Sequence, residues 1–287
     1  MKLFMKVTAP AKLNLFLHIT GRRNDGYHLL ESVFVFTEFG DFISIFESDS
    51  LSFTIDGQFQ SRLSDALIEN NIAYRAALLL QKKYHIASGA SIYLTKNIPV
   101  GAGLGGGSTD AAAVLKGLNQ FWNLNIDKKT LMELGLTLGA DVPACISAQS
   151  AFVSGIGENI NAIDLSFMPK FILLVNPCQS LSTSAIFQQY KKENKSFTAP
   201  LNDEIDFSTI LKSHNDLESA AIKSIPDTQT LLTILKQQKH CAFARMSGSG
   251  PTCFALFHDM NSAKLAEQVI QKQLPTYWIQ LTKLCIT

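Results

Sequence analysis

Glycines crowd one short loop of this chain and constrain what it can fold around. Five of the seven residues from Gly101 to Gly107 are glycine, Pro99 precedes them, and an alanine-rich segment begins just after Ser108-Thr-Asp110. Glycine lets the backbone take positive φ angles and leaves its N–H groups uncovered. Uncovered N–H groups that lead into a helix N-terminus form a site for anions, usually phosphates. The loop therefore predicts that the chain binds a nucleotide.

Two widespread phosphate loops fit this segment poorly, and a flexible glycine turn without a ligand is a further alternative. Three of the glycines satisfy the dinucleotide pattern G-x-G-x-x-G. That pattern should follow directly on a strand and precede an acidic residue about 20 residues later. Here Pro99 interrupts the approach, and residues 123–127 have the composition of a turn. The nucleoside-triphosphatase loop needs a lysine where Gly107 stands, so that interpretation fails.

The composition is that of an ordinary globular chain. Its 287 residues, 46% apolar and 17% charged, are enough for one large domain or two smaller ones. The formal net charge of +1 gives no electrostatic case for binding nucleic acid or an acidic membrane. We expect no signal peptide and no membrane span, because lysines interrupt the first residues and no apolar run approaches about 18 residues. Five scattered cysteines indicate free thiols in a reducing cytoplasm.

Hydrophobic patterns predict that strands and helices are mixed in the first half. The predicted strands are 2–8, 11–19, 31–38, 41–47, 51–55 and 90–95. A turn is expected from Gly21 to Gly26. The predicted helices are 65–84, 108–122 with Ser108 as N-cap, and 127–138 with Gly139 as its stop. Pro143 would lie beyond this last helix, with Asp141 in the exit turn.

The predicted strand at 11–19 has two different faces. Leucines alternate with other residues, so the leucines form a core face, and Lys12 and Asn14 share the opposite one. Lysine is rarely buried without a partner. Lys12 is therefore either a surface residue or one with a role in chemistry.

A second arrangement begins near residue 170. The predicted strands are 171–175, 241–246, 252–257 and 277–286, and the predicted helices are 183–192, 206–213, 216–224, 227–239 and 261–273. This order is that of a ferredoxin-like, split βαβ domain. We place the boundary near residue 165, which gives an N-terminal domain at 1–165 and a C-terminal domain at 166–287. The polar segment 191–202 is the best candidate for a mobile insertion.

Seven motifs, spread over nearly the whole chain, carry a resemblance to a known family. They are Ala9-Pro-Ala-Lys-Leu-Asn-Leu15, Asp25-Gly-Tyr-His28, the Pro99 to Ser108 loop, Leu138-Gly-Ala-Asp-Val-Pro143, Leu181-Ser-Thr-Ser-Ala-Ile-Phe187, Asn215-Asp-Leu-Glu218 and Met246-Ser-Gly-Ser-Gly-Pro251. With them the chain resembles the GHMP family of small-molecule kinases, and in particular its branch in the methylerythritol-phosphate route to isoprenoids. The glycine loop is similar to that family's phosphate loop.

The resemblance implies a two-domain α+β fold and a reaction. The N-terminal, ATP-binding domain would have ribosomal-protein-S5-like, left-handed βαβ character, the C-terminal domain would be ferredoxin-like, and the active site would lie in the cleft between them. The implied reaction moves the γ-phosphoryl group of ATP to the 2-hydroxyl group of a cytidine-diphosphate-linked methylerythritol. Mg²⁺ is expected as cofactor, held largely by the nucleotide and water, without an assigned protein ligand. A monomer or weak homodimer is expected.

The resemblance assigns catalysis to Lys12 and Asp141. Asp141 would accept the proton of the substrate hydroxyl; the alternative is a turn aspartate that only bonds nearby N–H groups. Lys12 would lower the pKa of Asp141 and of the hydroxyl, and would stabilise charge on the transferred group.

For ATP, the glycine loop and the following helix would hold the β- and γ-phosphates. Ser108 would bind magnesium or a phosphate oxygen, unless it only caps the helix. Asn71 and Lys96 are assigned to the adenine site. The other ATP-binding residues are Pro99, Val100, Gly101, Ala102, Gly103, Leu104, Gly105, Gly106, Gly107 and Thr109.

For the acceptor substrate, Tyr27 and His28 resemble residues that recognise cytosine, by stacking and by a hydrogen bond to the base edge. Without the motif, they read as a turn aromatic packed on the core and a surface histidine. The turn from Ser247 to Gly250 is expected to shape the phosphate or substrate region. The remaining substrate-binding assignments are Asn14, Thr183, Phe187 and Phe34, of which Phe34 has strand core as its alternative.

Three other functions stay open at this point. Another GHMP kinase, of the mevalonate or homoserine type, would have no cytosine for Tyr27 to stack on. A non-catalytic nucleotide sensor would require damage at Lys12 or Asp141, and both are present. A dehydrogenase would bind NADH.

Overall fold

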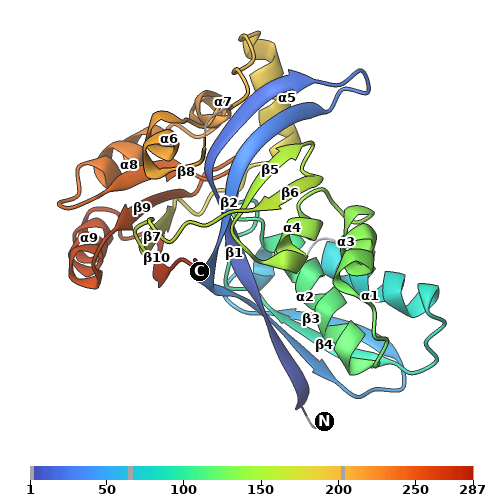
Figure 1. Cartoon of the computed structure of the whole chain (residues 1–287). Coiled ribbons are helices and arrows are strands. Elements are labelled where there is room, and N and C mark those ends of the chain that lie inside the picture. Colours follow the sequence, from blue (N-terminus) through green and yellow to red (C-terminus); the bar gives the residue numbers. More distant parts are fainter. Residues whose placement is uncertain (1–2, 64–66, 202–203, 287) are drawn as a thin grey trace. The chain divides into compact units, whose positions relative to one another are not determined.

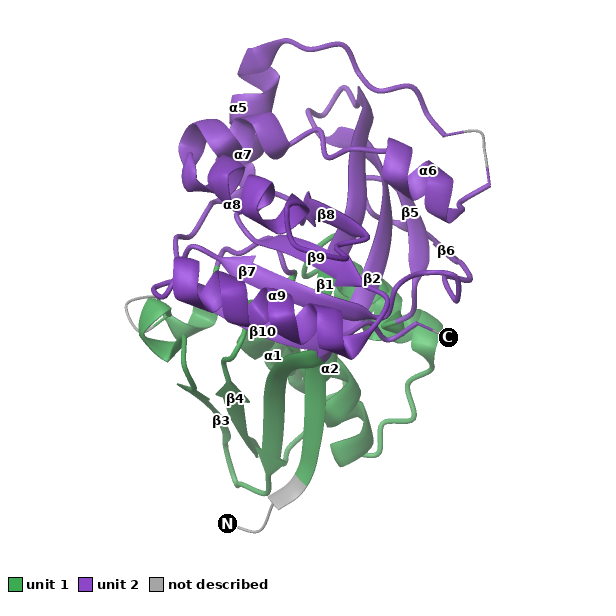
Figure 2. Cartoon of the chain, turned by 90° about the vertical axis from the view of Figure 1, so that its left-hand side faces the viewer, with its two compact units in different colours: residues 1–12, 39–100, 105–148 green, residues 13–38, 101–104, 149–287 purple. Residues whose placement is uncertain are grey.

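The computed structural model describes residues 3–63, 67–201 and 204–286, and the chain divides into two compact units. Figure 2 colours unit 1, residues 1–12, 39–100 and 105–148, and unit 2, residues 13–38, 101–104 and 149–287. The chain passes from one unit to the other within its first two strands and again within the glycine loop. The division into domains near residue 165 stays a prediction.

Two long strands, β1 (Leu3–Arg22) and β2 (His28–Phe46), form a hairpin through the turn at 24–26 (Figure 1). The sequence predicts four shorter strands here, and that prediction is wrong in each half of the hairpin; Lys2 lies outside the described residues. Pro10 does not break β1, which pairs with β2 and with no other described strand. Where a strand has a neighbouring strand on one side only, an N–H that faces the other side is not needed for pairing, so proline is tolerated there.

Unit 1 contains a small sheet with helices packed on it. β3 (Leu51–Asp56) runs parallel to β4 (Ala90–Thr95), which is antiparallel to the C-terminal part of β2. α1 (Ile72–Lys83) joins β3 to β4, so these three elements form a βαβ unit. α1 packs on α2 (Gly106–Phe121), which is buried all round from Thr109 to Leu115. The predicted helix at 65–84 therefore begins later, at Ile72, and residues 65–66 lie outside the described part.

Two helix boundaries near the site differ from the predictions. Gly105, and not Ser108, is the N-cap of α2, so that prediction is wrong. α3 (Lys128–Leu136) is capped by Asp127 as predicted but ends earlier. A short helix that the sequence did not predict, α4 (Val142–Ser147), follows it, with Asp141 at its N-cap and Pro143 in its first turn. Proline is favoured in a first turn because N–H groups there have no partner within the helix.

Unit 2 contains a four-stranded antiparallel sheet in the order β10 (Trp278–Lys283), β7 (Phe171–Asn176), β9 (Cys253–Phe257) and β8 (Phe243–Met246). Its strands and helices follow the predicted ferredoxin-like order. Alternating strand residues such as Leu173, Val175 and Phe257 are fully buried against the helices. The helices are α5 (Thr183–Glu193), α6 (Phe207–Lys212), α7 (Glu218–Ser224), α8 (Asp227–Lys236) and α9 (Met260–Gln273).

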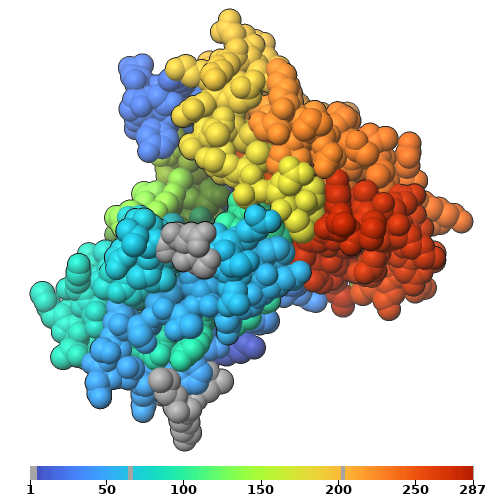
Figure 3. Space-filling model, turned by 180° about the vertical axis from the view of Figure 1, so that it is seen from behind, coloured from blue at the N-terminus to red at the C-terminus, as the bar shows by residue number. Residues whose placement is uncertain are grey.

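Further pairing in unit 2 was not predicted. β5 (Ala151–Gly155) is antiparallel to the N-terminal part of β2, and β6 (Asn159–Ala162) pairs with β5. Thr198, within the segment predicted as a mobile insertion, donates its N–H to the carbonyl of Ile19 at 2.9 Å; Asn202 of that segment lies outside the described residues. α9 and β10, red in Figure 3, lie together at the surface, where Leu265 is exposed.

Candidate active site

An ion pair joins Lys12 and Asp141 in unit 1. Nζ of Lys12 lies 2.9 Å from Oδ2 of Asp141, and the two side chains are 5% and 35% exposed. A buried ammonium group needs a compensating partner, because burial removes its solvation. Asp141 stands at the N-cap of α4, yet its side chain makes no capping hydrogen bond. Its carboxylate is thus held by Lys12 while it stays accessible to a substrate, which suits a proton acceptor.

Gly105, the N-cap of α2, lies directly on the Lys12 side chain. Its φ of 63° belongs to the left-handed region, and an added Cβ would lie 2.9 Å from Cε of Lys12. Only glycine meets both conditions without strain. Since no side chain caps α2, the helix begins with uncapped N–H groups beside the ion pair. Such a terminus attracts anions through its N–H groups and the helix dipole.

The middle of the glycine loop, residues 101–104, is held within unit 2. The carbonyl of Gly101 accepts from the N–H of Leu181 at 2.9 Å, and the carbonyl of Ala102 accepts from the N–H of Thr252 at 3.2 Å. The carbonyl of Gly103 accepts from the hydroxyl of Ser247 at 2.9 Å. In a trans peptide unit the N–H points opposite to the carbonyl. The N–H groups that follow these carbonyls therefore face away from unit 2's contacts, as a phosphate cradle requires.

The remaining residues of the loop differ in what they expose. Val100 and Ser108 are half-buried and Gly107 is exposed, whereas the side chains of Pro99, Ala102, Leu104 and Thr109 are buried. The Thr109 hydroxyl donates to the carbonyl of Gly106 at 2.9 Å. A nucleotide could meet most of this loop only through its backbone. The assignment of the loop to ATP stays a prediction.

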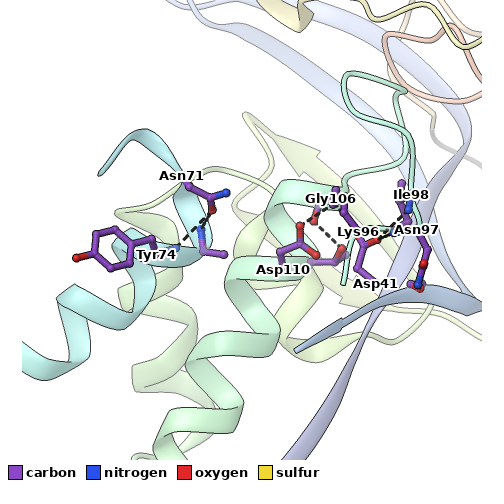
Figure 4. A network of polar contacts seen from close by, with 11 residues as sticks. Asp41, Asn71, Tyr74, Lys96, Asn97, Ile98, Gly106 and Asp110 are labelled. Atoms are coloured by element: carbon purple, nitrogen blue, oxygen red, sulfur yellow. Dashed lines mark hydrogen bonds and ion pairs between the residues drawn. The ribbon is translucent and has the colours of Figure 1, made fainter. Parts of the chain in front are cut away.

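The two residues assigned to adenine already have partners. Oδ1 of Asn71, the N-cap of α1, accepts from the N–H of Ala73 at 2.9 Å (Figure 4). Lys96 is buried between Asp41 and Asp110, with its Nζ 2.7 Å from Oδ2 of Asp110 and closer still to Asp41. Both adenine assignments stay predictions, but these contacts already account for why each polar side chain lies where it does.

Electrostatic interactions couple the charged side chains around Lys96 to one another. Burial by itself lowers the pKa of Lys96, but the charges of Asp110 and Asp41 outweigh it and raise that pKa above its ordinary value. Burial raises the pKa of Asp110 well above its usual range, against the attraction of Lys96. Sequence patterns predict no role for Asp41, and they place Asp110 only at the end of the glycine loop. The reason is that 55 and 14 residues separate the two aspartates from their shared lysine.

In unit 2, aromatic rings gather around His28. Its ring stacks on Phe187 with 5.3 Å between centroids and an angle of 26°, and the ring of Tyr190 meets it edge-on at 5.8 Å. Tyr27 is 62% exposed, while its N–H is fixed by Asp25 at 3.2 Å. Partial burial, helped by Arg22 and Lys191, lowers the pKa of His28, so its imidazole is neutral at pH 7. A neutral imidazole can both donate and accept a hydrogen bond.

The other three predicted substrate residues have different surroundings. Asn14 is buried, and its amide donates to the hydroxyl of Ser32 at 2.8 Å. Phe34 is buried in β2, in keeping with strand core. Thr183 is exposed in the first turn of α5, and its hydroxyl lies 3.0 Å from that of Ser249. Thr183 and Phe187 thus lie one turn apart on α5. The roles of all six residues in binding substrate stay predictions.

The oxygen donors near the ion pair fit only one kind of magnesium site. Within residues 3–63, 67–201 and 204–286, no group of three or more His, Cys, Asp or Glu side chains is arranged to hold a metal. Asp110 is engaged with Lys96, and Asp141 with Lys12. Mg²⁺ keeps several waters and binds readily to phosphate oxygens. These residues therefore fit only a Mg²⁺ held by a nucleotide and water; no protein ligand is assigned to it, and the metal stays a prediction.

Comparison with known proteins identifies the class. Residues 71–149 match the GHMP kinases N terminal domain and residues 197–276 match the GHMP kinases C terminal domain. The glycine loop, Lys96 and Asp141 fall in the first match, so fold and site together define a GHMP kinase. In the described residues, no helix is long and apolar enough to cross a membrane.

The relatives narrow the class to one family. A 4-diphosphocytidyl-2-C-methyl-D-erythritol kinase of Ehrlichia canis is 40% identical, over 97% of this chain and 98% of its own length. A solved 4-(cytidine 5'-diphospho)-2C-methyl-D-erythritol kinase has a TM-score of 0.81 and 29% identity, covering 98% of this chain and 99% of its own. The chain belongs to the 4-diphosphocytidyl-2-C-methyl-D-erythritol kinase family.

A more distant solved structure shares only the fold. Homoserine kinase from Cytophaga hutchinsonii has a TM-score of 0.69 at 19% identity, over 98% of this chain and 95% of its own. The two domain matches and the kinase relatives confirm the resemblance inferred from the seven motifs and the predicted fold class.

Proposed function

We propose that this chain transfers the γ-phosphoryl group of ATP to the 2-hydroxyl group of 4-diphosphocytidyl-2-C-methyl-D-erythritol. The observation that carries the proposal is the ion pair of Lys12 and Asp141, covered by Gly105 at the uncapped start of α2. A proton acceptor, a cation and a phosphate-binding helix terminus thus meet in one unit. Membership of the kinase family supports the same reaction.

Phosphoryl transfer needs little covalent help from a protein; it needs aligned reactants, neutralised charge and removal of a proton. Asp141 accepts the proton of the acceptor hydroxyl as that oxygen attacks. The ammonium group of Lys12 holds the Asp141 carboxylate in place and stabilises negative charge on the attacking oxygen and the transferred group. The N–H groups of the glycine loop and the start of α2 hold the β- and γ-phosphates. Bound Mg²⁺ would neutralise phosphate charge.

The cytidine end of the acceptor is assigned to unit 2. An exposed Tyr27 ring supplies a face on which a base can stack, and the neutral imidazole of His28, held by Phe187, can bond to the base edge. A substrate without a base would use neither group. This is the feature that separates the proposed acceptor from mevalonate and homoserine.

A coupled assay of ADP release tests the function. With MgATP, we expect turnover with 4-diphosphocytidyl-2-C-methyl-D-erythritol and none above background with mevalonate or homoserine. Turnover with another alcohol would show that the chain is a kinase and would contradict the assignment of Tyr27 and His28 to cytosine. ATP binding without turnover on any of the three would favour a nucleotide sensor. An NADH fluorescence change, which we do not expect, would favour a dehydrogenase.

Replacing Tyr27 by alanine is expected to raise the KM for the cytidylated acceptor and to leave the KM for ATP unchanged. Stacking of one base on an aromatic ring contributes about 1–3 kcal/mol, so a rise of about five- to 150-fold is expected. Steady-state kinetics with each substrate varied in turn measure both constants. Phe167→Ala, at another exposed aromatic of unit 2, is the control and should change neither. Equal rises in both KM values would contradict the assignment.

The setting of the protein is also part of the proposal. The five cysteines form no disulfide, and two of them, Cys145 and Cys253, are buried thiols. Free thiols are usual in a reducing compartment. We assign the chain to the cytoplasm, as a monomer or weak homodimer. Gel filtration across a range of protein concentrations distinguishes these two states.

A further inference from the structure

A buried cluster of three charged residues lies where the glycine loop leaves β4 and enters α2. Lys96 follows β4 directly, Asp41 belongs to β2, and Asp110 belongs to the second turn of α2 (Figure 4). The three side chains are 4%, 0% and 3% exposed. All three residues belong to unit 1. The cluster thus connects β2 with two later elements, β4 and α2, that flank the glycine loop.

Each member holds a different part of the loop's surroundings. Oδ1 of Asp41 accepts from the N–H of Asn97 at 2.6 Å and from the N–H of Ile98 at 2.8 Å, while its Oδ2 accepts from Lys96. The carboxylate therefore fixes the chain just before Pro99. Lys96 Nζ also donates to Oδ2 of Asp110 at 2.7 Å, which fixes α2 just after the loop. The two ends of the loop are tied together through one ammonium group.

The ammonium group also lies beneath the first residue of α2. A Cβ added to Gly106 would come within 2.9 Å of Nζ of Lys96. Gly106 therefore allows the lysine to pass under the helix start, where a side chain would displace it. A cation at a helix N-terminus opposes the helix dipole. The two carboxylates offset that cost, so the position of the lysine is set by the cluster and not by the helix.

Stability by itself does not account for such a cluster. Removing charges from water costs several kcal/mol per ion, and apolar residues of similar size often stabilise a fold as well or better. One oxygen, Oδ1 of Asp110, has no hydrogen-bond partner, which adds to the cost. What ion pairs supply and apolar contacts do not is a fixed direction between specific atoms. The cost is consistent with a cluster that serves geometry.

We propose that Asp41, Lys96 and Asp110 are positioning residues for phosphate binding, which fix the two ends of the glycine loop relative to each other without touching the nucleotide. This inference rests on the proposed function, since it takes the loop to bind the phosphates of ATP. Lys96 then acts on ATP affinity through the loop and not through a contact with adenine. Changes in the cluster should therefore weaken binding of the phosphate end of the nucleotide and leave binding of its adenine end unchanged.

Calorimetric titration of Asp110→Ala with MgADP and with adenosine tests the proposal. The substitution cuts the tie to α2 but leaves Lys96 paired with Asp41, so no lone charge is buried. We expect the Kd for ADP to rise about tenfold or more, because small displacements of positioned groups cost large factors. The Kd for adenosine should stay within about twofold of wild type, since this ligand has no phosphate for the loop to hold.

Two further variants separate positioning from folding. Asp110→Asn keeps an oxygen that accepts from Lys96, so it should restore most of the ADP affinity lost in Asp110→Ala. Lys116→Met removes a partly buried lysine from the same helix outside the cluster, and should change neither affinity. Circular dichroism shows that each variant is folded at the temperature of titration. If Asp110→Ala does not fold, Asp41→Asn gives the same comparison of the two ligands.

The outcomes are distinct. An equal loss of adenosine and ADP affinity would assign the cluster to the adenine site and overturn the proposal. Wild-type affinity of the alanine variant for ADP would overturn it as well, while the proposed function stands. A wild-type chain that binds no ADP would remove the proposed function and this inference together.

Discussion

Replacing Asp141 by asparagine is expected to lower kcat by about 10²–10⁴-fold, the usual contribution of a general base. Asparagine keeps the size of the side chain but cannot take the hydroxyl proton. Asp141 is 35% exposed and caps no helix, so the fold should persist, but the melting temperature should fall because the buried ammonium group of Lys12 loses its counter-charge. The Kd for ADP should be unchanged. Single-turnover kinetics with both substrates bound measure the chemical step directly.

A matched control exists on the neighbouring helix. Asp127 is the N-cap of α3, and its side chain does accept the N–H of Thr130 at 2.9 Å. Asp127→Asn makes the same chemical change at a residue of the same kind, and should leave kcat at the wild-type value. If Asp141→Asn instead lowered only the melting temperature and kept full activity, the carboxylate would be a structural partner of Lys12 and not the base.

Lys12→Met is expected to lower kcat by about 10²–10³-fold, as loss of one preorganised charge-stabilising group does elsewhere. Methionine fills a similar volume without charge, and the side chain is almost fully buried, so the packing around Gly105 should persist. Asp141 loses its partner but stays solvated. The effect should appear in kcat with little change in the KM for either substrate, because the charge acts on the transition state.

The pair should also act as a unit. In the double variant Lys12→Met, Asp141→Asn we expect a loss well below the product of the two single losses, because each residue works through the other. Lys6→Met, on the same strand, removes a lysine that lies over the ring of Phe42 at 4.0 Å and should leave kcat unchanged. Fully multiplicative losses would mean that Lys12 and Asp141 serve separate steps.

Some features of the site follow from neighbouring residues and were predictable. The glycine loop predicts a phosphate site because the groups that would bind phosphate are the backbone N–H groups of consecutive residues. Lys12 was predictable as a candidate functional residue because a lysine within an apolar strand pattern is rarely buried without a partner. The ferredoxin-like order of the second half follows from periodicity, since each strand and helix there carries its own apolar pattern.

Other predictions were wrong because the local sequence pattern was misleading. Pro10 and Gly40 look like breaks, yet β1 and β2 run through them, because the hairpin partner and not the local sequence sets strand length. Ser108 looks like an N-cap, but the N-cap is Gly105, three residues earlier, a glycine in the left-handed conformation. Asp141 does lie in the turn after α3, as predicted, but Pro143 does not end the helical region there and instead lies in the first turn of α4.

The sequence by itself determined the family, and it predicted the phosphate loop and the two residues assigned to catalysis, because each of these lies in a contiguous motif. Only the tertiary structure decided that Lys12 pairs with Asp141, 129 positions away by their numbering, and that Gly105 covers the lysine. It also decided that Lys96 is buried between Asp41 and Asp110. The physical reason is that the attraction between two charges falls off with the distance between them in space. The order of residues along the chain does not show that distance.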